Sequence, residues 1–207
     1  IDAFTLDNND IKKLYANFPD RPEEPNANRV YVAFDGQIND RISLYAQPYH
    51  YTYDPRIVRG LVEDPHFLLI GASAEGVVKT AYANVGNGKI TAVELNPQIV
   101  NLMRKHYRFD MYRRIDDLRQ MDGRTFLDST PASQKFDIIT LMNIHLINDV
   151  SRVGPPESLH TYEGISAMFD HLSERGFIIF EERLFNEQGE LSSLKILNTI
   201  LQVMKDR

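Results

Sequence analysis

The pattern of apolar and polar residues changes near residue 61, and the two parts of the chain predict different structures. Before this point Val30, Val32 and Phe34 alternate with other residues, the turn-rich stretch "DGQIND" follows, and the alternation then resumes. A period of two on both sides of a turn predicts a β-hairpin subdomain over residues 29–60. Residues 1–28 contain "NDIKKLYANF", typical of a short amphipathic helix, and then a proline-rich linker.

From residue 61 to residue 207, short apolar runs alternate with helical patterns. The runs do not alternate internally, which is typical of strands buried on both faces by helices. This segment therefore predicts an α/β fold, a Rossmann-like doubly wound sheet whose strands are mostly parallel, with one helix after the last strand and hence an atypical sheet end. We expect strands at 66–71, 89–95, 118–121, 135–142 and 176–182, and helices from 75, over 97–106, over 162–172 and from 191.

Composition narrows the classes of partner. The 207 residues are 43% hydrophobic with a formal net charge of -6, so we expect one main soluble domain that binds a small molecule. Nucleic acid and anionic membrane surfaces are not expected as partners, because both need a basic face. No cysteine is present and the six histidines are scattered, so no metal site is expected. We expect a cytoplasmic location, and the start at Ile1 fits a soluble domain of a longer protein.

The loop "GASAEG" follows the first predicted parallel strand. Gly71 permits a sharp turn, Ala72 and Ser73 keep the backbone approachable, and Gly76 is the second glycine of the loop. In a doubly wound sheet this turn faces a bound ligand, so these four residues are predicted to contact a cofactor. The loop is neither a P-loop, since Val77 stands where lysine is needed, nor a full G-x-G-x-x-G. As a bare pattern it is equally compatible with a turn that binds nothing.

Two carboxylates stand at the ends of the next two predicted strands. Glu94 ends "ITAVE" about twenty residues beyond the loop, where an acidic side chain can accept both hydroxyl protons of a ribose. Asp122 precedes Gly123 in "MDGRTFL" and can accept a hydrogen bond from an adenine amino group. Taken alone, Asp122 is better read as a helix N-cap. With the loop, the two carboxylates favour a nucleoside-binding site.

A hydrolase is the strongest alternative from another enzyme class. "GASAEG" comes within one residue of the G-x-S-x-G nucleophile elbow, with Ser73 as the nucleophile and Glu75 in place of the second glycine. However, the elbow normally follows the fifth strand of its sheet. The residues before Phe67 contain one predicted hairpin and a linker, too little for four strands and their crossovers.

Taken together, the motifs resemble the spermidine synthases (polyamine aminopropyltransferases), a family within the class I S-adenosylmethionine-dependent methyltransferase fold. "VYVAFDGQ", "QPYHY", "LLIGASAEGVV", "AVELNPQIV", "DGRTFL" and "KFDIITLM" follow in the order of that family, and the resemblance runs from about Arg29 to Glu182. It implies S-adenosylmethionine or its decarboxylated form as co-substrate, no metal, and leaves a homodimer open. By this resemblance Glu94 would hold the ribose, and Asp122 with Gly123 the adenine.

The chain departs from that family where the acceptor should bind. Ala74 stands where the family has an aspartate at the amine end of the donor. Met142 and His145 lie where the family has carboxylates, one of which helps to deprotonate the attacking amine. His145, Asn143 and Tyr49 are the remaining candidates for catalysis on a different acceptor, although a histidine in an apolar segment is more often structural.

Two hypotheses of different class follow. The chain is either a transferase that binds S-adenosylmethionine or its decarboxylated form and acts on an acceptor that the sequence does not identify, or a catalytically inactive binding or scaffolding domain of the same fold. The retained Glu94 and Asp122 favour the first hypothesis, and the missing acceptor carboxylates oppose a standard spermidine synthase. We therefore expect an adenosine ligand to bind and putrescine not to react.

Overall fold

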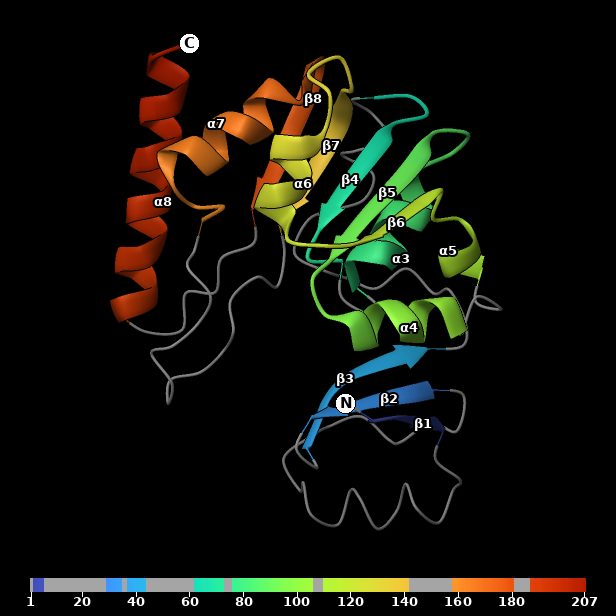
Figure 1. The fold of residues 1–207 in the computed structure, drawn as a ribbon. Helices are drawn as coiled ribbons and strands as arrows, with labels where there is room; N and C mark the ends of the chain where they lie inside the picture. Colours follow the sequence, from blue (N-terminus) through green and yellow to red (C-terminus); the bar gives the residue numbers. More distant parts are fainter. Residues whose placement is uncertain are drawn as a thin grey trace.

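The computed structural model confirms an α/β architecture around a parallel sheet (Figure 1). It describes residues 2–5, 29–34, 37–43, 62–72, 76–105, 110–141, 158–180 and 187–207. Its larger sheet has five strands in the order β6-β5-β4-β7-β8, and every neighbouring pair is parallel. The strands are β4 (His66–Ile70), β5 (Lys89–Glu94), β6 (Asp117–Gln120), β7 (Phe136–Leu141) and β8 (Leu172–Phe180).

The strand order reverses at β4, which is the feature that makes the sheet doubly wound. The chain runs from β4 outward to β5 and β6, and then crosses back to place β7 on the other side of β4. In open α/β sheets ligands bind beside the carboxyl ends of the strands at such a reversal. The fold therefore provides a binding position at the ends of β4, β5 and β7.

Helices cover both faces of this sheet (Figure 1). α3, α4 and Tyr112 of α5 contribute to one hydrophobic cluster, while α6, α7 and α8 contribute to a second one on the opposite face. The helices are α3 (Gly76–Asn84), α4 (Pro97–Lys105), α5 (Asp110–Arg113), α6 (Gly123–Ser129), α7 (Tyr162–Asp170) and α8 (Glu187–Lys205).

The unalternating strands are explained by this two-sided burial. Successive side chains of a strand point to opposite faces. In β4, Phe67 and Leu69 join the cluster under α3 and α4, whereas Leu68 and Ile70 join the cluster under α6 and α7. All four are at most 2% exposed, so both faces of the strand require apolar residues.

Three predicted element boundaries are wrong. The last strand was expected from Gly176 after a helix reaching Leu172, but α7 ends at Asp170 and β8 already begins at Leu172. His171 ends the helix: its two ring nitrogens lie 3.0 Å from the carbonyl oxygens of Gln134 and Leu127. The final helix begins at Glu187 and not at Leu191.

A second, antiparallel sheet precedes the parallel one. β2 (Arg29–Phe34) and β3 (Gln37–Ser43) form the predicted hairpin, and β1 (Asp2–Thr5) adds a third strand beside β2. The sequence predicts only a helix and a linker in residues 1–28, because the four residues of β1 are too few to show an alternating pattern. The helix expected at 9–18 lies outside the described residues, and the domain boundaries at 28 and 60 stay predictions.

Candidate functional site

The turn after β4 has the conformation that the sequence predicts for Gly71. Its φ of +72° lies in the left-handed region, which residues other than glycine rarely adopt. The backbone N–H groups of Gly71 and Ala72 both donate to the carbonyl of Val93 in β5, at 3.0 and 3.2 Å. The start of the loop is therefore fixed over the end of the neighbouring strand. Ala72 is fully buried there.

The helix expected from residue 75 is α3, which is described from Gly76, so its amino end follows the carboxyl end of β4 after a short connection. Val77 and Val78 are buried in the cluster under α3. The residues that exclude a P-loop are thus core residues. Ser73 lies outside the described residues, and its predicted contact with a ligand stays a prediction.

Glu94 is the last residue of β5 and is partly exposed at this edge. Its Oε1 accepts a hydrogen bond of 2.8 Å from the backbone N–H of Asn96, and its backbone carbonyl accepts one of 3.2 Å from Met121. The carboxylate is therefore oriented by the chain that immediately follows it. Asn96, the residue before α4, in turn accepts a bond of 2.9 Å at its side-chain oxygen from the N–H of Gln98.

Asp122 is the N-cap of α6, the alternative that the sequence left open. Its Oδ1 accepts hydrogen bonds from the backbone N–H of Thr125 at 3.0 Å and from the Thr125 hydroxyl at 3.3 Å. Capping accounts for an acidic residue at this position without a ligand. A contact with adenine is therefore an additional role, and it stays a prediction.

Gly123 is required by packing. A Cβ atom at this position would overlap Cγ2 of Ile70 and would lie 3.2 Å from Cδ1 of Leu159. The absence of a side chain lets the first turn of α6 rest directly on β4. The glycine that the resemblance assigns to adenine binding thus has a structural role in this chain.

The three predicted contact points are brought together through their chain neighbours. Gly71 bonds to Val93, the residue before Glu94; Glu94 bonds to Met121, the residue before Asp122. Gly123 lies against Ile70, the residue before Gly71. Gly71, Glu94 and Asp122 therefore lie around one point at the carboxyl edge of β4, β5 and β6.

One exposed apolar residue next to the candidate site is not among the residues predicted from the sequence. Leu95 follows Glu94 directly and is 56% exposed, unlike the buried apolar residues of β5. It adds an apolar surface next to Glu94 at the carboxyl edge. Leu95 stands between the last residue of β5 and Asn96, where packing in the core does not require an apolar side chain. This unexplained apolar residue is the signal that the sequence contains.

The predicted catalytic residues are not among those that the structure describes. Tyr49, Asn143 and His145 are outside the described residues, as are Ala74 and Met142. Their roles stay predictions. Within the described ranges, no group of three histidine or acidic residues could hold a metal ion, and no helix combines the length and apolarity of a membrane span.

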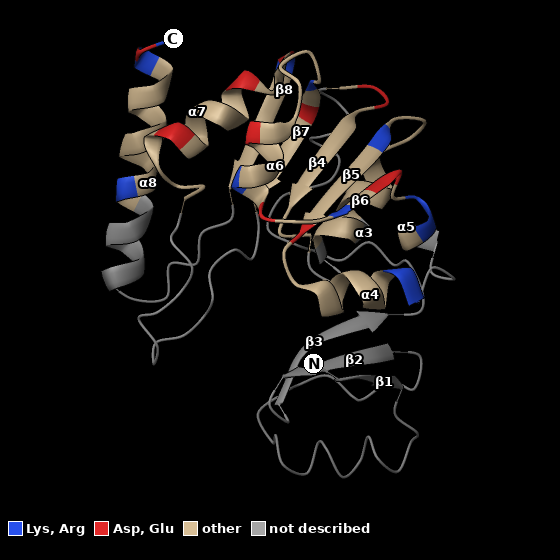
Figure 2. Cartoon of the chain, in the orientation of Figure 1, with Lys and Arg blue, Asp and Glu red and all other residues tan. Residues whose placement is uncertain are grey.

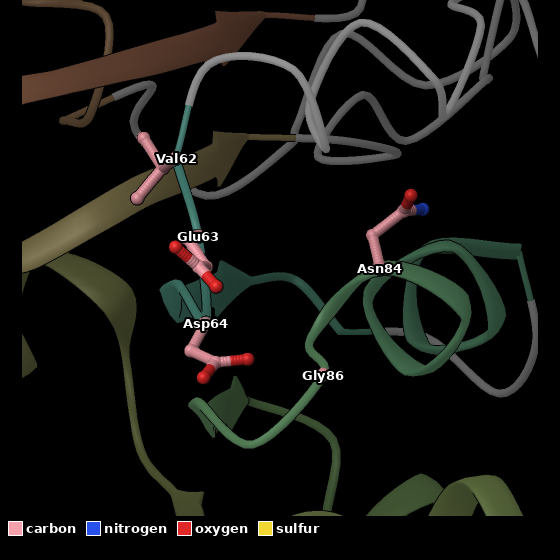
Figure 3. A pocket seen from close by; sticks show the side chains of 5 residues that line it. All are labelled: Val62, Glu63, Asp64, Asn84 and Gly86. Atoms are coloured by element: carbon pink, nitrogen blue, oxygen red, sulfur yellow. The ribbon is translucent and has the colours of Figure 1, made fainter.

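A cavity of about 200 Å³ lies at the opposite, amino edge of the sheet, lined by Val62, Glu63, Asp64, Asn84 and Gly86. In Figure 3 the amide of Asn84 and the two carboxylates do not converge on a common point. Asp64 is already bonded to the N–H and amide groups of Asn87, at 2.8 and 3.3 Å. This cavity therefore has no arrangement for a ligand comparable to the carboxyl edge.

Comparison with solved structures shows which fold this is. A probable spermidine synthase from Corynebacterium glutamicum is 17% identical with a TM-score of 0.62, over 85% of this chain and 63% of that one. A spermidine synthase bound to the transition-state analogue AdoDATO is 18% identical with a TM-score of 0.56, over 84% and 57%. Human methyltransferase-like protein 13, bound to SAH, is 15% identical with a TM-score of 0.52, over 71% and 65%.

These likenesses establish the fold shared by S-adenosylmethionine-dependent methyltransferases and spermidine synthases. The chain matches between 57% and 65% of the length of these three proteins. No family model matches the chain, and no curated protein matches it. The fold class predicted from the sequence is thus confirmed, while membership of the spermidine synthase family stays a resemblance.

Proposed function

We propose that this chain binds S-adenosylmethionine or its decarboxylated form at the carboxyl edge of the sheet and acts as a group transferase. The observation that carries the proposal is the convergence of Gly71, Glu94 and Asp122 at the strand-order reversal. The fold alone would permit many functions, because function depends on the site and not on the architecture. A sharp turn and two carboxylates in one place support a nucleoside as the ligand.

The residues present fit an adenosine group. The carboxylate of Glu94, held at Oε1 by Asn96, would accept hydrogen bonds from the ribose hydroxyls. The exposed side chain of Leu95 would contact the apolar face of the base, and Asp122 would accept a bond from its amino group. The remainder of the ligand would pass beside Gly71, which is partly exposed, whereas Ala72 is fully buried.

The co-substrate, when bound, supplies a carbon activated by a sulfonium. In the transfer the bond from that carbon to sulfur breaks, a bond to the acceptor nucleophile forms, and the sulfonium becomes a neutral thioether. An acceptor that carries a proton must lose it to a base. We propose His145 for that role, with Asn143 and Tyr49 positioning the acceptor, because an imidazole has a suitable intrinsic pKa.

The acceptor is proposed to be something other than putrescine. A diamine carries two ammonium charges, which carboxylates must balance while a base removes one proton. The chain has Met142, His145 and Ala74 at the three places where the resemblance puts acidic residues. An assay with putrescine and decarboxylated S-adenosylmethionine should therefore yield no spermidine, and efficient turnover would refute this part of the proposal.

Calorimetric titration tests the binding step separately from the reaction. S-adenosylmethionine, its decarboxylated form and methylthioadenosine would each be titrated into the chain, its Glu94→Ala variant and a matched Glu63→Ala variant at the opposite edge. Loss of a charged acceptor costs about 1.5 to 3 kcal/mol, so Glu94→Ala should weaken binding roughly ten- to a hundredfold, and Glu63→Ala should not. If none of the three ligands binds at millimolar concentration, the transferase proposal fails in favour of an inactive binding domain.

A further inference from the structure

Asn96 connects the carboxylate of Glu94 to helix α4. Only two residues separate the end of β5 from the start of α4 (Figure 1). The backbone N–H of Asn96 donates to Oε1 of Glu94 at 2.8 Å. Its backbone carbonyl accepts from the N–H of Val100 at 3.1 Å, and its side-chain oxygen accepts from the N–H of Gln98 at 2.9 Å. One residue is therefore bonded to the candidate site on one side and to the helix on the other.

The two bonds between Asn96 and α4 are those of a helix N-cap. An N-cap residue accepts the first bond of the helix at its carbonyl, and its side chain accepts from a backbone N–H two or three residues later. Asparagine is among the residues preferred for this role. Pro97, the first residue of α4, has no N–H that would need a partner. The side chain of Asn96 thus fixes the backbone conformation at residue 96.

The helix that Asn96 caps is held firmly by the domain. Ile99, Leu102 and Met103 are at most 7% exposed and belong to the hydrophobic cluster under α3 and α4. A helix anchored by three buried side chains keeps its first residues in a constant position relative to the sheet. Glu94 is therefore fixed at two points, through its backbone in β5 and through the N–H that its carboxylate accepts.

The charges of α4 also favour a carboxylate at its amino end. Figure 2 shows the basic residues of this helix in its last turn, and these are Arg104 and Lys105. The first turn contains no acidic residue. The amino end of a helix carries a partial positive charge that attracts anions. The carboxylate of Glu94, bonded to the N–H of the capping residue, lies at this end.

We propose that Asn96 is a positioning residue for the ribose: by capping α4, its side chain holds the N–H that orients the carboxylate of Glu94. This inference rests on the proposed function, in which Glu94 accepts the ribose hydroxyls. A glutamate side chain loses rotamer freedom when it binds a ligand. The bond at Oε1 restricts that freedom in advance, and such pre-organisation strengthens binding.

A direct contact between the Asn96 side chain and the ligand is the alternative explanation of any effect on binding. The side-chain oxygen already accepts from Gln98, so the amide nitrogen would have to make that contact. Asn96→Ala removes both the cap and the nitrogen, whereas Asn96→Ser keeps an oxygen suited to an N-cap and has no amide. The two variants therefore separate capping from contact.

Calorimetric titration with methylthioadenosine and S-adenosylmethionine measures the effect. Asn96→Ala should weaken binding about three- to tenfold, as expected for the loss of an N-cap, and less than Glu94→Ala does. Asn96→Ser should bind within about twofold of the unaltered chain. Asn101→Ala, an exposed position of the same helix, and Thr161→Ala, which removes the N-cap of α7, should leave affinity unchanged. In a Glu94→Ala chain, Asn96→Ala should weaken binding no further.

Hydrogen exchange without a ligand measures the positioning itself. After correction for intrinsic rates, the amide of residue 96 should exchange at least about fivefold faster in Asn96→Ala and Glu94→Ala than in the unaltered chain. Asn96→Ser should restore slow exchange. Equal rates in all four chains would show that neither the cap nor Glu94 holds this amide, and would overturn the inference.

The titrations also separate failure of this inference from failure of the proposed function. If the unaltered chain binds no adenosine ligand, both are refuted. If it binds and Glu94→Ala weakens binding, normal affinity of the Asn96→Ala chain would overturn the positioning role alone. Equal losses in Asn96→Ala and Asn96→Ser would assign the effect to the amide and would likewise overturn it.

Discussion

The two edges of the parallel sheet use acidic residues in different ways. At the amino edge, Asp137 connects three strands: its Oδ2 accepts from the N–H of His66 at 2.9 Å, and its Oδ1 accepts from the hydroxyl of Ser173 at 2.6 Å. These partners lie 71 and 36 residues away in the sequence. One carboxylate therefore holds β4, β7 and β8 together.

Asp116 also joins separate segments at the amino edge, those that precede β5 and β6. Its Oδ2 accepts from the N–H of Ile90 at 2.8 Å and from Arg114 at 2.9 Å, and Arg114 donates to the carbonyl of Gly88 at 2.6 Å. The loops that lead into β5 and β6 are thereby fixed to one another. The amino edge uses its charges to join distant segments.

At the carboxyl edge, two carboxylates accept hydrogen bonds from residues close to them in the sequence. Glu94 accepts from a residue two positions later, and Asp122 from one three positions later. Such bonds orient a side chain but join no distant elements. The amino edge thus joins distant strands through Asp137 and Asp116, and under the proposed function the carboxyl edge presents Glu94 and Asp122 to a ligand.

The largest effect that separates the edges is expected for Asp137→Ala. It removes two charged hydrogen bonds and leaves the partly buried N–H of His66 without its acceptor, which should cost about 3 kcal/mol of unfolding free energy. Urea denaturation measures this, with Ser173→Ala as the control that removes only one of the bonds. A loss below about 1 kcal/mol would mean that Asp137 does not hold the strands together.

A smaller loss of stability is expected for Gly123→Ala. The added Cβ would meet Cγ2 of Ile70, and overpacking of this kind costs about 1 to 3 kcal/mol. Removing the opposing atoms with Ile70→Ala should make the two substitutions non-additive in a double-mutant cycle. Strict additivity would show that α6 does not rest on β4 at this point.

Asp122→Ala should have a double effect. Loss of the N-cap of α6 should cost about 1 kcal/mol of stability, and under the proposed function the affinity for an adenosine ligand should also fall. Thr161→Ala removes the corresponding N-cap of α7, whose hydroxyl accepts from Gly164 at 3.1 Å. It should cost similar stability and leave ligand affinity unchanged. Equal effects of both variants on affinity would remove Asp122 from the site.

The smallest effect concerns pH and the amino edge. Burial, helped by the charge of Lys89, lowers the pKa of His66 below its ordinary value of 6.5. The unfolded chain therefore binds a proton at His66 more readily than the folded chain. The contribution of His66 to the unfolding free energy is fully present above pH 6.5, and it is lost as the pH falls towards the pKa of His66 in the folded state. His66→Gln should flatten that slope in denaturation measured between pH 7 and pH 5. An unchanged slope would mean that other groups cause it.

The parallel sheet could be predicted from the sequence because strands buried on both faces appear as continuous apolar runs. Each buried strand needs apolar residues on both faces, so β4, β5 and β7 appear as unbroken runs. The start of β8 was missed because Leu172 to Arg175 lack such a run, being only partly buried or exposed. β1 was missed because its pairing with β2 depends on residues far away in the sequence.

The candidate site was predictable only in part. Gly71, Glu94 and Asp122 stand out because each follows a strand, and the fold brings strand ends together. The packing role of Gly123 depends on Ile70 and Leu159, and no spacing in the sequence indicates those contacts. Asp137 lies inside an apolar run, and its bond to a residue 71 positions earlier has no local signal.

The claim that the carboxyl edge is the ligand edge is tested most directly by hydrogen exchange. Backbone amides would be followed with and without saturating S-adenosylmethionine or methylthioadenosine. The account predicts slower exchange at residues 71–72, 94–96 and 121–125, with no change at 62–66, 86–90 and 114–117. Protection at the amino edge, or bound ligand without protection at the carboxyl edge, would contradict it.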